Sequence, residues 1–132
     1  MEVNEYIQTL PEERQAAVLA LHSLILSNDH SVKAKLSPMM GKIMIRYDQG
    51  ETFKYALAGE NKQLTLHCMP IYCNTRFKDK YLALLTGVKV QKGCINFVGK
   101  GPLPFKVLAD LIAECAAVDM PSITAGQKEH RK

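Results

Sequence analysis

The segment LTLHCMPIYCN, residues 64–74, gathers the side chains best suited to metal or thiol chemistry. It holds His67, Cys68 and Cys73, but neighbouring side chains on a strand point to opposite faces. His67 therefore shares a face with Thr65, whereas Cys68 shares the other face with the flanking leucines. The gap from Cys68 to Cys73 is also wider than a zinc-binding CxxC pair, and no second pair exists. We expect Cys68 to be a core residue and predict no metal site here.

A second possibility is a thiol nucleophile at Cys94, with His67 as its base. A reactive cysteine needs an electropositive and partly open setting. Lys92 lies nearby in the sequence, and Gly93 would let a ligand approach closely. No third residue is evident to orient the histidine. A structural thiol is therefore the favoured interpretation, and no residue is predicted to be catalytic.

Tyrosine and lysine side chains extend this region to a possible ligand pocket. Tyr47 and Tyr55 fall on one face of neighbouring strands, where their hydroxyls with that of Tyr72 would form a polar cluster around His67 at the mouth of a cleft. The alternative is an ordinary aromatic contribution to the core. Lys42 and Lys92 would bind an anion if the fold brings them together, although neither lies in a phosphate-binding loop. The predicted pocket consists of His67, Tyr72, Tyr55, Lys42, Lys92 and Cys94.

Length and composition describe the domain that must position these residues. The chain has 132 residues, 47% of them apolar, and a formal net charge of +4. We predict a single domain over residues 1–120 and a basic, flexible tail over residues 121–132. Because the tail carries part of the positive charge, no dedicated nucleic-acid surface is expected. The polar N-terminus and the lack of a long apolar run predict a cytoplasmic protein without a membrane segment and with reduced cysteines.

The hydrophobic pattern predicts helices at both ends of this domain and strands between them. Thr9 is expected to cap the first long helix, with Glu12 completing a capping box. Alternation places Phe53, Tyr55 and Leu57 on one face of their strand. We predict strands at 42–47, 52–58, 63–69 and 92–97, helices at 77–85 and after Pro104, and a loop at 35–41. This order is typical of a two-layer α+β domain.

Three segments resemble the YdhG-like family, also called domain of unknown function 1801. They are EYIQTLPEERQAAVLALHSLI, YALAGENKQLTLHCMP and KGCINFVGKGPLPFKVLADLI, which together span most of residues 2–116. The resemblance implies an α+β sandwich, with an antiparallel sheet of about five strands and the N- and C-terminal helices packed on one face. Some members are described as distantly frataxin-like iron chaperones. That role would require clustered carboxylates, for which this chain offers Glu5, Glu12 and Glu13, whereas its net charge is positive.

The functional expectation is therefore a cytoplasmic, non-enzymatic domain that binds a small ligand or a protein near His67, Tyr72 and Lys92. The domain is expected to carry no cofactor, and a homodimer is one of the assemblies considered for it. One alternative is an iron-binding chaperone that uses the three glutamates. The other is a small enzyme that uses Cys94 or His67.

Overall fold

Six antiparallel strands form one sheet in the computed structural model, which describes residues 2–39, 41–59, 63–85, 88–91, 93–98 and 103–124. Their spatial order is β1-β2-β3-β4-β6-β5. Gly41 and Gly50 have positive φ angles of 78° and 64°, which suit them to the tight turns on either side of β2. The strands are β1 (Val32–Met39), β2 (Lys42–Gln49), β3 (Thr52–Gly59), β4 (Gln63–Cys68), β5 (Lys89–Gln91) and β6 (Cys94–Val98).

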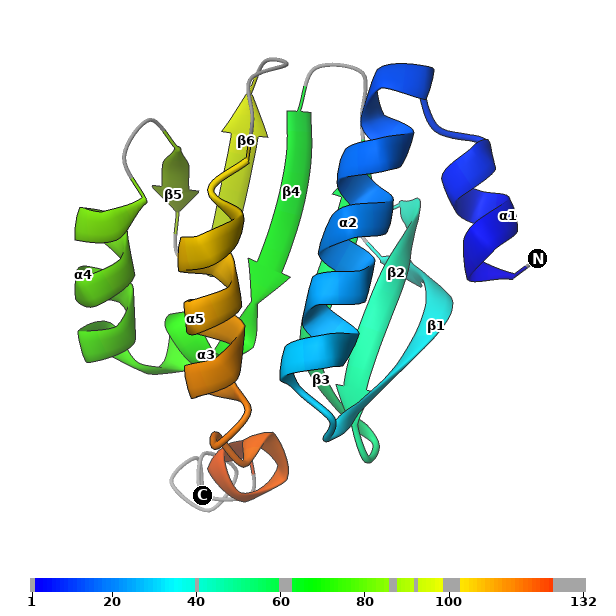
Figure 1. Ribbon diagram of the computed structural model, residues 1–132. Coiled ribbons are helices and arrows are strands. Elements are labelled where there is room, and N and C mark those ends of the chain that lie inside the picture. Colours follow the sequence, from blue (N-terminus) through cyan, green and yellow to red (C-terminus); the bar gives the residue numbers. More distant parts are fainter. Residues whose placement is uncertain are drawn as a thin grey trace.

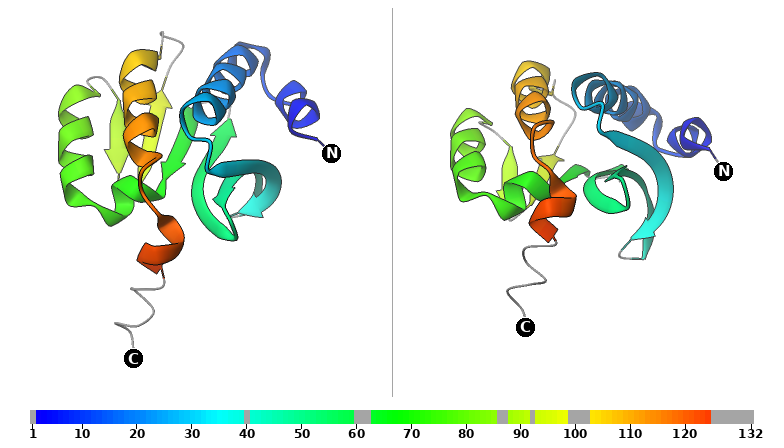
Figure 2. Two further views of the ribbon diagram at one scale, coloured as in Figure 1. Left: turned by 60° about the horizontal axis from the view of Figure 1, so that its bottom comes forward. Right: turned by 90° about the horizontal axis from the view of Figure 1, so that it is seen from below.

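The long helices cover one side of this sheet. They lie together on that side in Figures 1 and 2, with α2 beside α5, α1 next to α2, and α4 next to α5. The main core, between sheet and helices, includes Leu21, Ile25, Leu66 and Leu111, all buried. The helices are α1 (Val3–Gln8), α2 (Glu12–Asn28), α3 (Met69–Cys73), α4 (Thr75–Leu84) and α5 (Phe105–Cys115). The predicted two-layer α+β fold is confirmed, with six strands rather than about five.

The side of the sheet away from these helices is called the open face below. One row of its residues crosses all six strands through directly paired positions (Lys35, Arg46, Ala56, His67, Cys94 and Gln91). Alternation from that row gives the remaining members. They are Lys33, Ser37, Met39, Lys42, Met44, Asp48, Phe53, Ala58, Gln63, Thr65, Lys89, Asn96 and Val98. Met44, Ala56 and Ala58 form a small buried cluster there, against which Met39 and Phe53 pack.

The predicted loop at 35–41 is wrong, because β1 extends to Met39. Ala34 and Leu36 pack against the main core, and Lys33 and Lys35 alternate with them on the exposed side. β1 is an edge strand of the described sheet, and an edge strand tolerates a proline such as Pro38. Most of the segment predicted as an apolar loop is therefore the second half of β1.

The predicted capping of the first long helix by Thr9 is also wrong. Thr9 instead ends α1, where its hydroxyl donates to the Tyr6 carbonyl oxygen at 2.6 Å. α2 begins at Glu12 after Pro11, with no side-chain cap. The Thr9 hydroxyl is therefore engaged at the end of the preceding short helix, so it is not available to the next one.

A β-bulge changes the expected face of one residue in β3. The register shifts between Tyr47 and Asp48, so that Tyr47 pairs with Tyr55 whereas Asp48 pairs with Phe53. The intervening Lys54 is left unpaired and turns into the molecule, where it is fully buried. Regular alternation predicts that Phe53 shares the core side with Tyr55. Because of the bulge, Phe53 lies on the open face instead.

The C-terminal end of the domain continues past the predicted boundary. Residues 120–124 are helical, and the Met120 backbone N–H donates to Gln49 Oε1 at 2.8 Å. The first residues of the predicted tail therefore belong to the folded part, and residues 125–132 lie outside the described residues. Among the described helices, none has the length and hydropathy of a membrane span.

Candidate functional site

His67 and Cys94 meet on the open face, in the middle of the sheet. They are directly opposite each other on β4 and β6, and His67 Nδ1 lies 3.2 Å from Cys94 Sγ. Both side chains are half-buried. Depending on the imidazole tautomer, either the thiol donates to Nδ1 or the N–H donates to sulfur. The structure thus brings together the two residues whose chemistry was paired in the sequence.

The electrostatics of this pair favour its neutral form. Burial lowers the pKa of His67 below its ordinary value of 6.5, because desolvation disfavours the imidazolium. Burial likewise raises the pKa of the Cys94 thiol above 9.0, because desolvation disfavours the thiolate. The thiolate is the nucleophilic form of cysteine. At neutral pH the pair is therefore a hydrogen-bonded thiol and imidazole, suited to contact and recognition more than to attack.

A second polar pair lies one row further along the same strands. Thr65 Oγ1 donates to Asn96 Oδ1 at 2.9 Å, and both residues are buried on the open face. Their cross-strand pairing is direct, as for His67 and Cys94. The small Ala56 and Ala58 side chains on β3 adjoin these polar pairs. The middle of the open face is consequently polar on β4 and β6 and apolar on β3.

The other members of the predicted pocket that the structure describes do not join this pair. Tyr55 lies on the opposite side of the sheet, buried in the core, so its predicted cluster with His67 is wrong. Tyr47 lies on that side too, and its hydroxyl is 2.6 Å from His22 Nδ1. Lys42 lies at the end of β2, opposite Met39. Lys92 lies outside the described residues.

Tyr72 is on α3, with its side chain largely exposed. It packs beside Gly93, where an added Cβ would lie only 2.8 Å from Tyr72 Cβ and 3.2 Å from the Cys68 carbonyl oxygen. The space that the glycine was expected to leave for a ligand is therefore occupied by the protein itself. Tyr72 instead helps to line a pocket of about 310 Å³ that α3 and α4 form with Thr75 and Lys78.

A buried charged network is the main polar feature that the sequence did not reveal. Lys54 Nζ lies 2.8 Å from Asp29 Oδ2 and donates to the Val118 carbonyl oxygen at 3.0 Å. Tyr55 donates its hydroxyl to the same Asp29 oxygen at 2.7 Å. Hydrogen bonds from Lys54, Ser31 and Tyr55 outweigh desolvation and hold the pKa of Asp29 below its ordinary 3.8. The network joins the end of α2, the β3 bulge and the segment after α5.

The surroundings of Cys68 confirm the prediction that it is a core residue. It is buried with the leucines of β4, as alternation predicts, and its Sγ lies 3.9 Å from Cys115 Sγ on α5. Cys73 sits at the end of α3. None of the four cysteines of the chain forms a disulfide in the structure.

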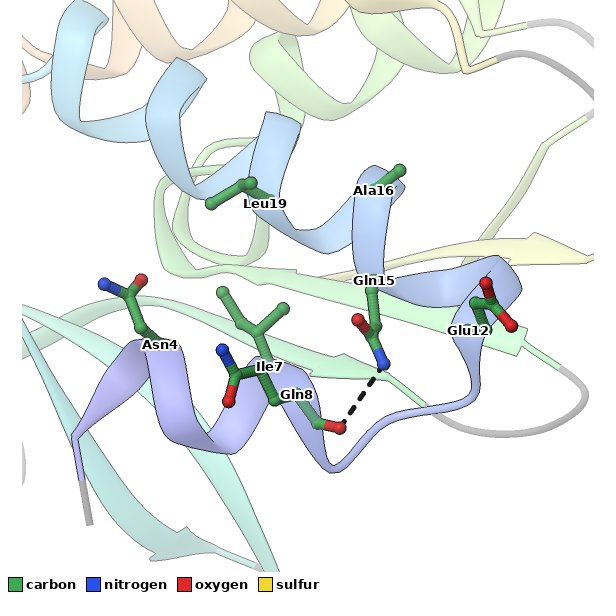
Figure 3. A pocket seen from close by; sticks show the side chains of 7 residues that line it. All are labelled: Asn4, Ile7, Gln8, Glu12, Gln15, Ala16 and Leu19. Atoms are coloured by element: carbon green, nitrogen blue, oxygen red, sulfur yellow. Dashed lines mark hydrogen bonds between the residues drawn. The ribbon is translucent and has the colours of Figure 1, made fainter.

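A second pocket lies between α1 and α2, and all of its lining residues belong to these two helices. It has a volume of about 630 Å³, and its side chains are shown in Figure 3, including Ile7 and Leu19 as apolar members. The side-chain amide of Gln15 donates across it to the Gln8 carbonyl oxygen at 3.3 Å. Glu12 is a further lining residue. The pocket contains none of the residues singled out as the ligand pocket in the sequence.

The three glutamates considered for iron do not form a cluster. Glu5 is on α1, whereas Glu12 and Glu13 occupy the first turn of α2. Within the described ranges, no three residues of the His, Cys, Asp and Glu types lie close enough together to hold a metal ion. Hard metal ions need several oxygen ligands in one place, so the geometry lends the carboxylate site no support.

Comparisons with known proteins identify a relative in fold. No protein-family model matches the sequence, and no curated protein matches it. A crystal structure of a protein from the DUF1801 family, YdhG from Bacillus subtilis, superposes with a TM-score of 0.64. The match covers 84% of this chain and 84% of that chain, at 12% sequence identity. At this identity the likeness shows the shared fold, and function has to be argued from the site.

Proposed function

We propose that this chain is a YdhG-like, non-enzymatic binding domain whose contact surface is the open face of the sheet. The observation that carries the proposal is the position of the His67–Cys94 pair. By the sheet register it lies on the open face, half-buried and away from the core that the helices cover. Polar groups held in place on a broad scaffold are the usual means of fixing the orientation of a partner. The predicted cytoplasmic location stays part of this proposal.

A protein partner suits this face better than a small molecule. The row through His67 and Cys94 runs across all six strands, from Lys35 on β1 to Gln91 on β5. A partner that contacts this row must extend over several strands, as protein interfaces do.

Protection of the Cys94 thiol is the expected signature of such a partner. In a Cys73→Ser variant, the remaining cysteines besides Cys94 are the buried Cys68 and Cys115. We expect a cell extract to slow the reaction of Cys94 with a chromogenic disulfide reagent by at least about fivefold. The slowing should occur with the macromolecular fraction of the extract and not with the low-mass fraction.

The matched control is a Cys94→Ser variant, in which the same reagent reports on Cys73 at the end of α3. Its labelling rate should be unchanged by either fraction. Protection by the low-mass fraction would indicate that the partner is a small ligand and not a protein. Unchanged Cys94 labelling with both fractions would contradict the proposed surface.

Thiol chemistry is the second candidate function, because Cys94 Sγ lies within hydrogen-bond distance of His67 Nδ1. A Cys–His nucleophile would react with iodoacetamide at neutral pH faster than free cysteine does. Since burial raises the pKa of Cys94, we expect the opposite, a slower reaction at neutral pH whose rate rises with pH and does not level off until above pH 9. His67→Gln should change this rate by less than about threefold. A fast reaction that His67→Gln abolishes would favour the enzyme.

A further inference from the structure

Charged side chains are unevenly distributed between the two sides of the described molecule. Among the described residues, the open face carries five cationic side chains, Lys33, Lys35, Lys42, Arg46 and Lys89, and a single carboxylate, Asp48. The described helices and the segments flanking them carry most of the acidic residues, including Glu5, Glu12, Glu13, Asp110 and Glu114. The net charge of the whole chain therefore understates how basic the open face is.

The one carboxylate described on the open face holds two cations in place and neutralises only one of the five positive charges. Asp48 is almost fully covered, and it contacts Arg46 Nε at 2.6 Å and Lys35 Nζ at 3.3 Å. The Arg46 guanidinium also lies over the Phe53 ring, 5.2 Å from its centroid. Both contacts hold the guanidinium in place on the sheet. What an approaching molecule meets is a set of positioned cations beside an aromatic ring.

The spread of these cations excludes a small anion as the best fit. Lys35 and Arg46 lie on β1 and β2, whereas Lys89 lies on β5 at the other edge of the described sheet. At ordinary strand spacing, β2 and β5 are about 19 Å apart. No small anion spans that distance, but an extended or helical protein segment does.

The chemistry between the cations favours a protein segment over nucleic acid. Single-stranded nucleic acid binds by stacking bases on free aromatic faces. Phe53 is the one phenylalanine or tyrosine among the described residues of the open face, and one side of its ring is already taken by Arg46. Phe53 and the 70% exposed Val98 provide apolar contacts instead. Apolar contacts bracketed by cations match an acidic segment that alternates carboxylates with apolar side chains.

We propose that the partner of the open face is an acidic, amphipathic protein segment, recognised by the cations on β1, β2 and β5. This inference rests on the proposed function and adds the chemistry of the partner. The probe is a labelled synthetic peptide that alternates glutamate with leucine, followed by fluorescence anisotropy. A peptide with lysine in place of glutamate and a uridine oligonucleotide of similar length serve as comparisons. We expect the acidic peptide alone to bind, with an affinity that falls as salt rises.

Charge reversal on the open face should weaken this binding about tenfold. The variant is Lys35→Glu with Lys89→Glu. Its matched control is Arg76→Glu with Lys106→Glu, which makes the same change in net charge at exposed positions on α4 and α5. The control should bind within about twofold of the unaltered protein. Circular dichroism of both variants should show the unaltered fold.

Each other outcome overturns the inference. If the control variant lost as much affinity for the acidic peptide, the effect would come from net charge alone. Equal or tighter binding of the oligonucleotide would show that the open face binds nucleic acid. Concentration-dependent dimerisation that Lys35→Glu abolishes would make a second copy of the chain the occupant. Failure of the peptide to bind while a protein fraction still protects Cys94 would reject the acidic segment and leave the proposed function standing. Failure of both would reject the two together.

Discussion

Replacing Lys54 with methionine should lower the free energy of unfolding by about 3–5 kcal/mol, the usual cost of leaving one partner of a buried ion pair alone. The Lys54 ammonium and the Asp29 carboxylate are both buried, 2.8 Å apart. Methionine is of similar length but carries no charge. The variant therefore leaves Asp29 ionised in the core with only neutral donors from Ser31 and Tyr55. Urea denaturation at neutral pH measures the loss.

The double variant Asp29→Asn with Lys54→Met is the informative comparison. With both charges removed, no unpaired charge remains in the core, so we expect the double variant to lie within about 2 kcal/mol of the unaltered protein. Lys33→Met, at an exposed position of β1, should change stability by less than about 0.5 kcal/mol. A double variant no more stable than Lys54→Met would show that the cost comes from lost packing and not from the charge.

The dependence on pH gives a second test of the same pair. In the unaltered protein the pKa of Asp29 is lowered, so its contribution is complete above the ordinary value of 3.8 and is lost as pH falls through the lower folded value. In Lys54→Met the main hydrogen-bond partner is gone and desolvation acts on the carboxylate with less opposition. Asp29 then takes up a proton at a higher pH. The stability difference between the two proteins should narrow as pH falls from neutral, and a widening difference would contradict this assignment.

Much of the layer structure was predictable because it follows from local periodicity. The alternation in β2, β3 and β4 and the helical spacing in α2 and α5 reflect which side chains face the core. Cys68 was placed correctly on this basis alone. Where a single residue breaks the alternation, as at the bulge beside Lys54, the pattern gave the wrong face for Phe53. Nothing in the local sequence distinguishes that bulge from a regular strand.

The candidate site was predictable in part for a different reason. His67 and Cys94 were paired by chemical type, but their contact depends on β4 and β6 being neighbours although α3, α4 and β5 separate them in the chain. Tyr55 was assigned to the same pocket because alternation along one strand does not show which face the next strand presents. The cations of the open face were likewise invisible in the net charge, because only the sheet register brings Lys35, Arg46 and Lys89 onto one surface.

Two adjacent residues of β4 should respond very differently to truncation, because they face opposite sides of the sheet. Leu66 is fully buried beneath the helices, between Leu57 on β3 and Ile95 on β6. Leu66→Ala opens a cavity there and should lower the free energy of unfolding by about 2–5 kcal/mol. His67→Ala removes a half-buried ring from the open face and should cost less than about 1 kcal/mol. Urea denaturation of the two variants, under identical conditions, measures both losses.

The same two variants separate stability from recognition. His67→Ala should abolish the hydrogen bond to Cys94 and weaken partner binding while the fold persists. Leu66→Ala should retain binding under conditions where the variant stays folded, because the open face keeps its side chains. If His67→Ala proved as destabilising as Leu66→Ala, the histidine would be part of a second core. The open face would then be covered in the native protein and unavailable to a partner.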